Sequence, residues 1–243
     1  MKGDIVKRME LDGATKEDMY ALFASQFDGV PRTEFLRDLD EKNWVLLLYG
    51  DDDSLAGFSS MDVYTTNVGD RELTVVYSGD TVVDINTWSD SALSYYWMGA
   101  VDFLQRAYAA ERLYWFLLVS GYRTYRFLPV YSEFFYPRYD EPTPNDVQEI
   151  MHALARRRFG DRYDPSTGVV RLRTPPVLRG ELGGIPKNRL GDPHIAFFAE
   201  RNPGYGRGDE LVCFSVLAED KLTRLGKRMW RKGRKLLAAP GPE

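Results

Sequence analysis

A short polar segment interrupts the most strand-like stretch of the sequence. Ser78-Gly79-Asp80-Thr81 lies between β-branched apolar residues on both sides. A glycine inside a strand weakens it and often marks a bulge or the close approach of a ligand. A buried carboxylate needs a partner. The segment therefore predicts Asp80 as a general base or as a ligand for a substrate amine, beside Ser78 and Thr81. A solvated aspartate at a strand end is the alternative.

A second group of polar residues follows the wholly apolar run Leu113–Ser120. Loops at the carboxyl ends of central strands bind ligands in open α/β sheets. The arginine fork holds a carboxylate or a phosphate through two hydrogen bonds. We therefore expect Arg123 or Arg126 to bind an anionic group, although a solvated pair on a helix would give the same pattern.

The loop at 202–210 is the most unusual in the chain. Its sequence, from Asn202 to Asp209, contains three glycines within five residues. Glycine permits positive φ and close backbone contact. The loop could fold over a site and present Asn202 and Asp209 to a substrate, or it could be a flexible hairpin tip. It lacks the Gly-Lys-Ser/Thr of a phosphate-binding loop.

The chain has few of the residues that bind metals or form disulfides. The chain of 243 residues has one cysteine and two histidines. Cys213 lies in an apolar run, which is typical of a buried thiol, and neither His152 nor His194 has a partner at metal-ligand spacing. We expect no metal site. The charged N-terminus and the absence of a long apolar run predict a soluble, cytoplasmic protein without a signal peptide.

Hydrophobic periodicity predicts the elements that must position these residues. An early strand and two helices precede three antiparallel strands, which end with Glu72–Val83. A helix over Ser89–Ala109, the strand Leu113–Ser120 and a helix over Tyr122–Tyr136 follow. A helix is then expected over Asn145–Phe159. His194–Glu200 and Glu210–Leu217 are expected to form a pair of strands, and Leu217–Leu237 a final helix. This order predicts an α+β fold with a mixed, mostly antiparallel sheet flanked by helices.

The final helix carries a strongly basic segment. Lys221–Lys235 contains eight Lys or Arg residues and no acid, although the formal net charge of the chain is −4. Apolar residues are interleaved at helical spacing. The segment could bind nucleic acid, an acidic carrier protein or an anionic membrane surface. A helix that packs its apolar face on the domain and leaves its cations in solvent would look the same.

The order of elements over residues 1–140 resembles the core of the Gcn5-related N-acetyltransferase (GNAT) superfamily. Phe135-Tyr136-Pro137-Arg138-Tyr139 is similar to the ending that follows its fifth strand. The resemblance implies a GNAT-like core over 1–140 and a C-terminal extension over 141–243. It also implies two parallel strands that splay apart, here Glu72–Asp84 and Leu113–Ser120, with the thioester of an acyl-CoA between them.

The resemblance further implies roles for individual residues. Tyr136 matches the general acid that protonates the leaving thiolate, with Tyr131 as a second choice and Glu133 as a nearby base. The acyl-CoA, acetyl-CoA or another thioester, would contact the strand and helix residues Val82, Val83, Trp88 and Ser89, and the arginines Arg123 and Arg126. The implied activity is acyl transfer to the amine of a small molecule.

The chain departs from the family at the pyrophosphate loop. The family has the motif Arg/Gln-x-x-Gly-x-Gly/Ala at this place. The corresponding residues 84–92 of this chain contain no glycine and no arginine, and they include Asp84 and Asp90. Glycines there let backbone N–H groups approach the phosphates. The alternative is therefore a GNAT-like fold that no longer uses CoA and binds or transforms a small polar, amino-acid-like substrate.

Overall fold

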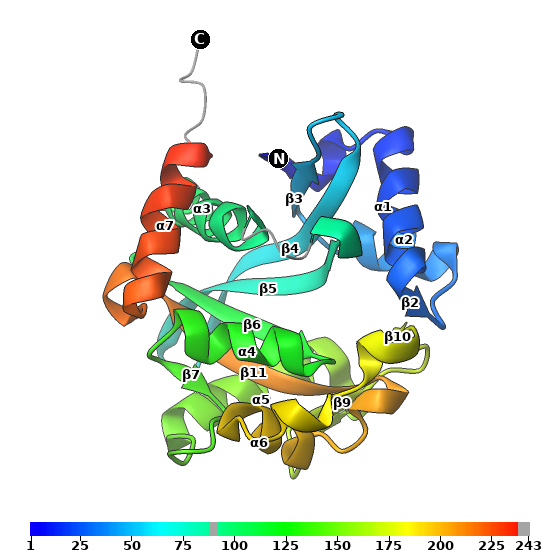
Figure 1. Cartoon of the computed structure of the whole chain (residues 1–243). Helices are drawn as coiled ribbons and strands as arrows, with labels where there is room; N and C mark the ends of the chain where they lie inside the picture. The colour runs from blue at the N-terminus through cyan, green and yellow to red at the C-terminus, as the bar shows by residue number, and fades with distance from the viewer. Residues whose placement is uncertain (88–91, 238–243) are drawn as a thin grey trace.

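A single mixed sheet organises the protein, for which a computed structural model describes residues 1–87 and 92–237. Its main strands run in the order β1-β3-β4-β5-β6-β11-β9-β8 (Figure 1). Their bounds are β1 Lys2–Lys7, β3 Trp44–Tyr49, β4 Leu55–Val68, β5 Arg71–Val83, β6 Leu113–Val119, β11 Asp209–Leu217, β9 Val169–Arg171 and β8 Tyr163–Asp164. Neighbours pair antiparallel except β5 and β6, which are parallel. The predicted α+β class with a mostly antiparallel sheet is confirmed.

Helices cover both faces of this sheet. On one face α3 (Ala92–Ala107), α4 (Tyr122–Tyr131), α6 (Pro193–Arg201) and α7 (Arg224–Leu236) share a core with β6 and β11. On the other face, α1 (Gly13–Gln26) and α2 (Arg32–Asp40) pack on β3 and β4, and α5 (Asn145–Phe159) packs on β6 and β11. The alternation of side chains along each strand explains this division, since successive residues point to opposite faces.

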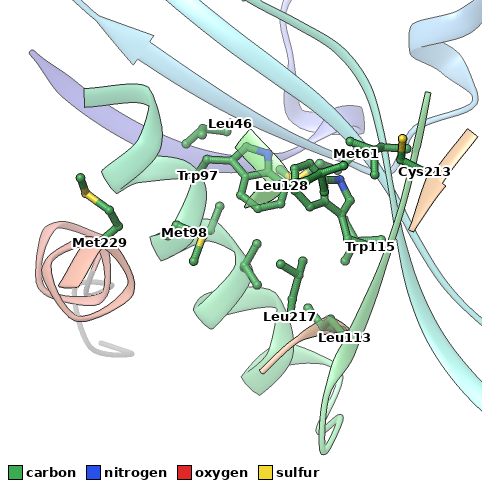
Figure 2. Packing of buried hydrophobic residues seen from close by; sticks show 14 of the residues in the cluster. Leu46, Met61, Trp97, Met98, Leu113, Trp115, Leu128, Cys213, Leu217 and Met229 are labelled. Atoms are coloured by element: carbon green, nitrogen blue, oxygen red, sulfur yellow. The ribbon is translucent and has the colours of Figure 1, made fainter. Parts of the chain in front are cut away.

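The core under α3 is rich in large side chains. Figure 2 shows Trp97 and Met98 of α3, Trp115 of β6 and Met229 of α7 gathered in this layer. The rings of Trp97 and Trp115 lie 4.4 Å apart. Burial of such rings contributes strongly to stability because each removes a large apolar area from water.

The C-terminal hundred residues continue the same sheet. β11 pairs with β6 from Leu211↔Val119 to Leu217↔Leu113. The short strand β7 (Phe135–Tyr136) pairs with β11 as well. The sheet is therefore continuous across residue 140. A second, two-stranded sheet joins β2 (Phe27–Asp28) to β10 (Val177–Leu178).

Several predicted elements differ from the structure. Residues 194–200 form helix α6, so the predicted strand pair there is wrong. Asp192 caps this helix by accepting a hydrogen bond from the backbone N–H of His194 at 3.0 Å, and Pro193 occupies the first turn. Asp followed by Pro is a strong helix start. The helix predicted to reach Tyr136 ends at Tyr131, and the last helix begins at Arg224, after its cap Thr223.

Among the described residues, no helix is long and apolar enough to cross a membrane.

Candidate active site

The two parallel strands at the centre of the sheet separate part-way along their length. β5 and β6 pair from Val75↔Tyr114 to Ser78↔Leu117. Beyond that point β5 stays paired with β4, and β6 stays paired with β11. The sheet therefore opens a gap between 79–83 on one side and Leu118–Val119 on the other.

A β-bulge in β5 lies at the start of this gap. Met61 pairs with Ser78 and Ser59 pairs with Thr81, so the single residue Ser60 faces both Gly79 and Asp80. A bulge bends its strand and redirects a side chain. Gly79 permits the geometry because a Cβ there would lie 2.5 Å from Cε of Lys42 and 2.7 Å from Oγ of Ser60. The predicted irregularity at Gly79 is thus confirmed as a bulge.

A cavity of about 680 Å³ occupies the gap. On the α3 and α4 side its wall includes Leu93, Trp97 and Phe127. On the opposite face the wall is formed by α1, α2 and the C-terminal part of the sheet, including Phe23, Phe35, Asp38, Tyr77, Leu172 and Glu210. The cavity therefore reaches both faces of the sheet, and its size is that of a ligand site.

Asp80 lies in this cavity with a strongly perturbed carboxyl. Burial of the carboxyl and the negative charge of Asp38 together raise its pKa to about 7, although the positive charge of Lys42 acts in the opposite direction. The side chain is half-buried, with its exposed part in the cavity wall. A carboxyl with a pKa near neutrality exchanges protons readily at neutral pH, which suits a general base.

A second carboxyl, Glu210 of β11, lies in the same cavity. Its residue is 8% exposed. Burial and, to a smaller extent, the negative charges of Asp80 and Asp38 together raise its pKa to about 8. Two acids with raised pKa values therefore share one enclosed space.

Lys42 and Arg158, two cations near this site, form ion pairs with other acids. The side chain of Lys42 is fully buried and donates to Oδ2 of Asp38 at 2.6 Å. Arg158 donates to Oδ2 of Asp62 at 2.8 Å and lies 3.9 Å over the ring of Tyr77. Lys42 thereby joins the end of α2 to the bulge, where its charge also acts on Asp80. Among the described residues, neither Asp80 nor Glu210 forms an ion pair.

The structure places five of the residues singled out from sequence around the cavity. These are Ser78, Asp80, Thr81, Val83 and Arg123. Oγ of Ser78 accepts a hydrogen bond from Nε1 of Trp115 at 2.9 Å, and the hydroxyls of Thr81 and Ser59 are 2.7 Å apart. Arg123 donates to the carbonyl of Leu182 at 2.9 Å.

Other predicted residues on β5 and α4 lie beside the cavity without lining it. Val82 points into the core beneath α1 and α2. Arg126 forms an ion pair with Asp192 at 2.9 Å and ties α4 to α6. The hydroxyl of Tyr131 is 2.9 Å from Oγ of Ser94, which itself lines the cavity. Trp88 and Ser89 lie outside the described residues.

The remaining predicted residues have structural contacts away from the cavity. Tyr136 lies in β7, and its hydroxyl donates to Glu141 at 2.6 Å. Glu133 is exposed, and its carbonyl accepts from Arg138. Asn202 is buried and donates to the carbonyl of Asp209, whose carboxylate forms an ion pair with Arg171. These contacts close the loop 202–209 upon itself. The catalytic role of Tyr136 and the substrate-binding roles of the others stay predictions.

Sequence reasoning missed Glu210, Asp38 and Lys42. A signal for Glu210 was present, because it is in phase with Val212, Phe214 and Val216 on one strand face. An acid in phase with a buried apolar face is a candidate for function. Among the described residues, no group of three His, Cys, Asp or Glu side chains could hold a metal ion.

The layout of this site matches the resemblance found in the sequence. The chain forms an antiparallel meander, then helix α3, then strand β6. β6 is parallel to β5 and separates from it beyond Ser78. The fold is GNAT-like.

Comparisons with known proteins give the following. No family model and no curated protein matches the chain. Solved structures that match include a probable N-acyltransferase from Enterococcus faecalis, at 15% identity and a TM-score of 0.40 over 56% of this chain and 33% of that one. A GNAT family N-acetyltransferase from Escherichia coli in complex with CoA matches at 15% identity and a TM-score of 0.39, over 52% of this chain and 68% of that one. Tetrahymena Gcn5 matches at 13% identity and a TM-score of 0.43, over 59% of this chain and 84% of that one. This chain thus spans a third of the first of these proteins.

Proposed function

We propose that the protein transfers an acyl group from an acyl-CoA, or another thioester, to the amine of a small molecule in the cavity between β5 and β6. The observation that carries this proposal is Asp80, held at a bulge in the gap with a pKa of about 7. Attack on a thioester requires an amine that has lost its proton, and a carboxylate poised near neutrality supplies the base.

The residues present fit a thioester in this gap. Among residues 1–87 and 92–237, no strand pairs with Gly79–Thr81 of β5 on the β6 side, so an extended ligand could bind this edge. Leu93 and Phe127 supply apolar walls on the α4 side. Arg123, at the start of α4, lies on the cavity rim where an anionic group of the donor would enter.

The proposed reaction balances with few protein groups. The amine nitrogen forms a bond with the carbonyl carbon, the carbon–sulfur bond breaks, and Asp80 accepts the proton of the amine. The leaving thiol has an ordinary pKa of about 8.5, so it departs as a thiolate or takes a proton from water. A dedicated general acid such as Tyr136 would add to the rate without being required.

The test is to measure release of a free thiol from acetyl-CoA and longer acyl-CoAs with a panel of small amines. Thiol release should depend on both components. Acetyl-CoA at about 100 times its dissociation constant should also stabilise the protein by about 2.7 kcal/mol against unfolding. An unchanged melting temperature across the whole panel of acyl-CoAs would contradict the proposal.

A second candidate is a site that binds a small polar substrate without CoA. Trp97 and Trp115 favour it, because both rings line the cavity and occupy its α3 side. This candidate predicts a ligand beside Ser78 and Asp80 with no dependence on a thioester. Binding of nucleic acid or an acidic carrier through Lys221–Lys235 remains a separate prediction.

A further inference from the structure

Glu210 is a buried acid without a partner. Only 8% of the residue is exposed, and it lines the cavity. No hydrogen bond or ion pair to its carboxyl is present within residues 1–87 and 92–237. Its neighbour Asp209, by contrast, forms an ion pair with Arg171. An isolated buried carboxylate is costly unless a cation or hydrogen-bond donors accompany it.

The side of the cavity away from α3 carries acids and arginines, and one of these arginines, Arg37, forms an ion pair with Glu34. Asp80 and Asp38 both lie on this wall, and their charges act on Glu210. Lys42 is bonded to Asp38, and Arg158 is bonded to Asp62. Arg162 and Arg173 also line the cavity, but neither makes an ion pair with Glu210 in the described part of the chain. Among the described residues no cation forms an ion pair with Glu210, so a cation that enters the cavity would complete one there.

The wall next to Glu210 also suits an aliphatic cation. Tyr77, Leu118 and Leu172 line the cavity, and one of them offers an aromatic ring. Arg158 and Lys42 already lie 3.9 Å and 5.5 Å from the centre of the Tyr77 ring, so Leu118 and Leu172 supply the apolar surface for a ligand. A methylene chain that carries a charged nitrogen to Glu210 would meet this apolar surface, in a cavity that Asp80 also lines.

We propose that Glu210 binds a second, permanently protonated nitrogen of the acceptor, so that the acceptor is a small diamine whose reacting nitrogen lies at Asp80. The inference rests on the proposed function for the reacting nitrogen. The binding role of Glu210 does not depend on the identity of the acyl donor. Asp80 removes a proton from one nitrogen, whereas Glu210 retains the charge of the other.

The experiment measures binding of 1,4-diaminobutane and of butylamine to the full chain by calorimetry. The diamine should bind at least tenfold more tightly than the monoamine, since only the diamine reaches both acids. E210Q should reduce this preference to less than twofold. E200Q, at an exposed position of α6, should keep it. E210D, which retains the charge, should keep part of the preference and guards against a loss that reflects misfolding.

Equal binding of the diamine and the monoamine to the native protein would overturn the inference, and so would a full preference in E210Q. Acetyl-CoA binding is measured in the same samples. If the diamine preference depends on Glu210 but no acyl-CoA binds, the proposed function fails and the role of Glu210 stands. If acetyl-CoA binds equally to native protein and E210Q but neither prefers the diamine, only the inference about Glu210 fails.

Discussion

Two buried acids in this molecule have opposite surroundings. Asp102 of α3 is 2% exposed, and it accepts hydrogen bonds from Arg106 at 3.1 Å and from Nε of Arg234 at 2.7 Å. Glu210 is 8% exposed and has no such partner among the described residues. The first acid joins two helices, since Arg234 belongs to α7. The second lies in a cavity wall.

The difference separates structural acids from functional ones. Next to Asp102, α3 and α7 pack so closely that a Cβ on Gly99 would lie 2.5 Å from the carbonyl oxygen of Gly233. A closed contact of this kind leaves no room for a ligand, and the acid is satisfied within the protein. The gap between β5 and β6 leaves room, and its acids are unsatisfied until something binds. Perturbed acids in a cavity are a recognised mark of function.

The largest expected effect of a substitution is the loss of kcat when Asp80 is replaced. D80N should lower kcat for acyl transfer about 10²- to 10⁴-fold, because an amide cannot accept the proton of the amine. In the native protein the rate should rise as the pH passes about 7, since only the ionised carboxyl is a base. Steady-state kinetics over a pH series checks both.

The matched control for this prediction is D70N, which alters an exposed turn before β5. It should leave kcat and the pH profile unchanged. A D80N variant with native kcat would show that another group removes the proton.

The next prediction concerns Asp102, the acid that is satisfied within the protein. D102A should lower the free energy of unfolding by about 2 kcal/mol, because it removes charged hydrogen bonds that join α3 to α7. The arginines are more than half exposed and can turn to solvent, which limits the loss. Denaturant unfolding measures this change. The folded variant should keep the native kcat, and a large fall in kcat would break the distinction between the two acids.

A third effect concerns the pH dependence of stability at Glu210. Its pKa is about 8 in the folded protein, above the ordinary value of 4.5. The folded state therefore binds more protons than the unfolded state between these values, and stability falls as pH rises through this range. Glutamine does not titrate, so E210Q removes this pH-dependent loss. The variant should be more stable than the native protein at pH 8 and similar to it near pH 4.

Denaturant unfolding at the two pH values checks the prediction at Glu210, with E200Q as the exposed control. A stability difference that is the same at pH 4 and pH 8 would show that Glu210 is ionised or partnered in the native protein.

Local patterns in the sequence were enough for the centre of the fold. The meander, the helix before β6 and the irregularity at Gly79 all follow from runs of apolar residues and the place of one glycine. Asp80 was found because it interrupts such a run. α6 was mistaken for a strand because its residues are apolar and aromatic, and the start signal at Asp192-Pro193 was overlooked.

The second half of the site depends on contacts that no local pattern encodes. Glu210 reaches the cavity because β11 pairs with β6, almost a hundred residues earlier in the chain. Lys42 reaches the bulge because glycine at 79 leaves space for its side chain. Tyr136 was chosen by its place in a family motif, yet pairing of β7 with β11 directs its hydroxyl to Glu141.

In the proposed function, the gap between β5 and β6 receives the acyl donor. A crystal structure of the full chain with acetyl-CoA tests it directly. We expect the thioester to lie between residues 79–82 of β5 and Leu118–Val119 of β6, with the carboxyl of Asp80 facing the acyl carbon. Acetyl-CoA bound elsewhere, with this gap unchanged, would contradict it.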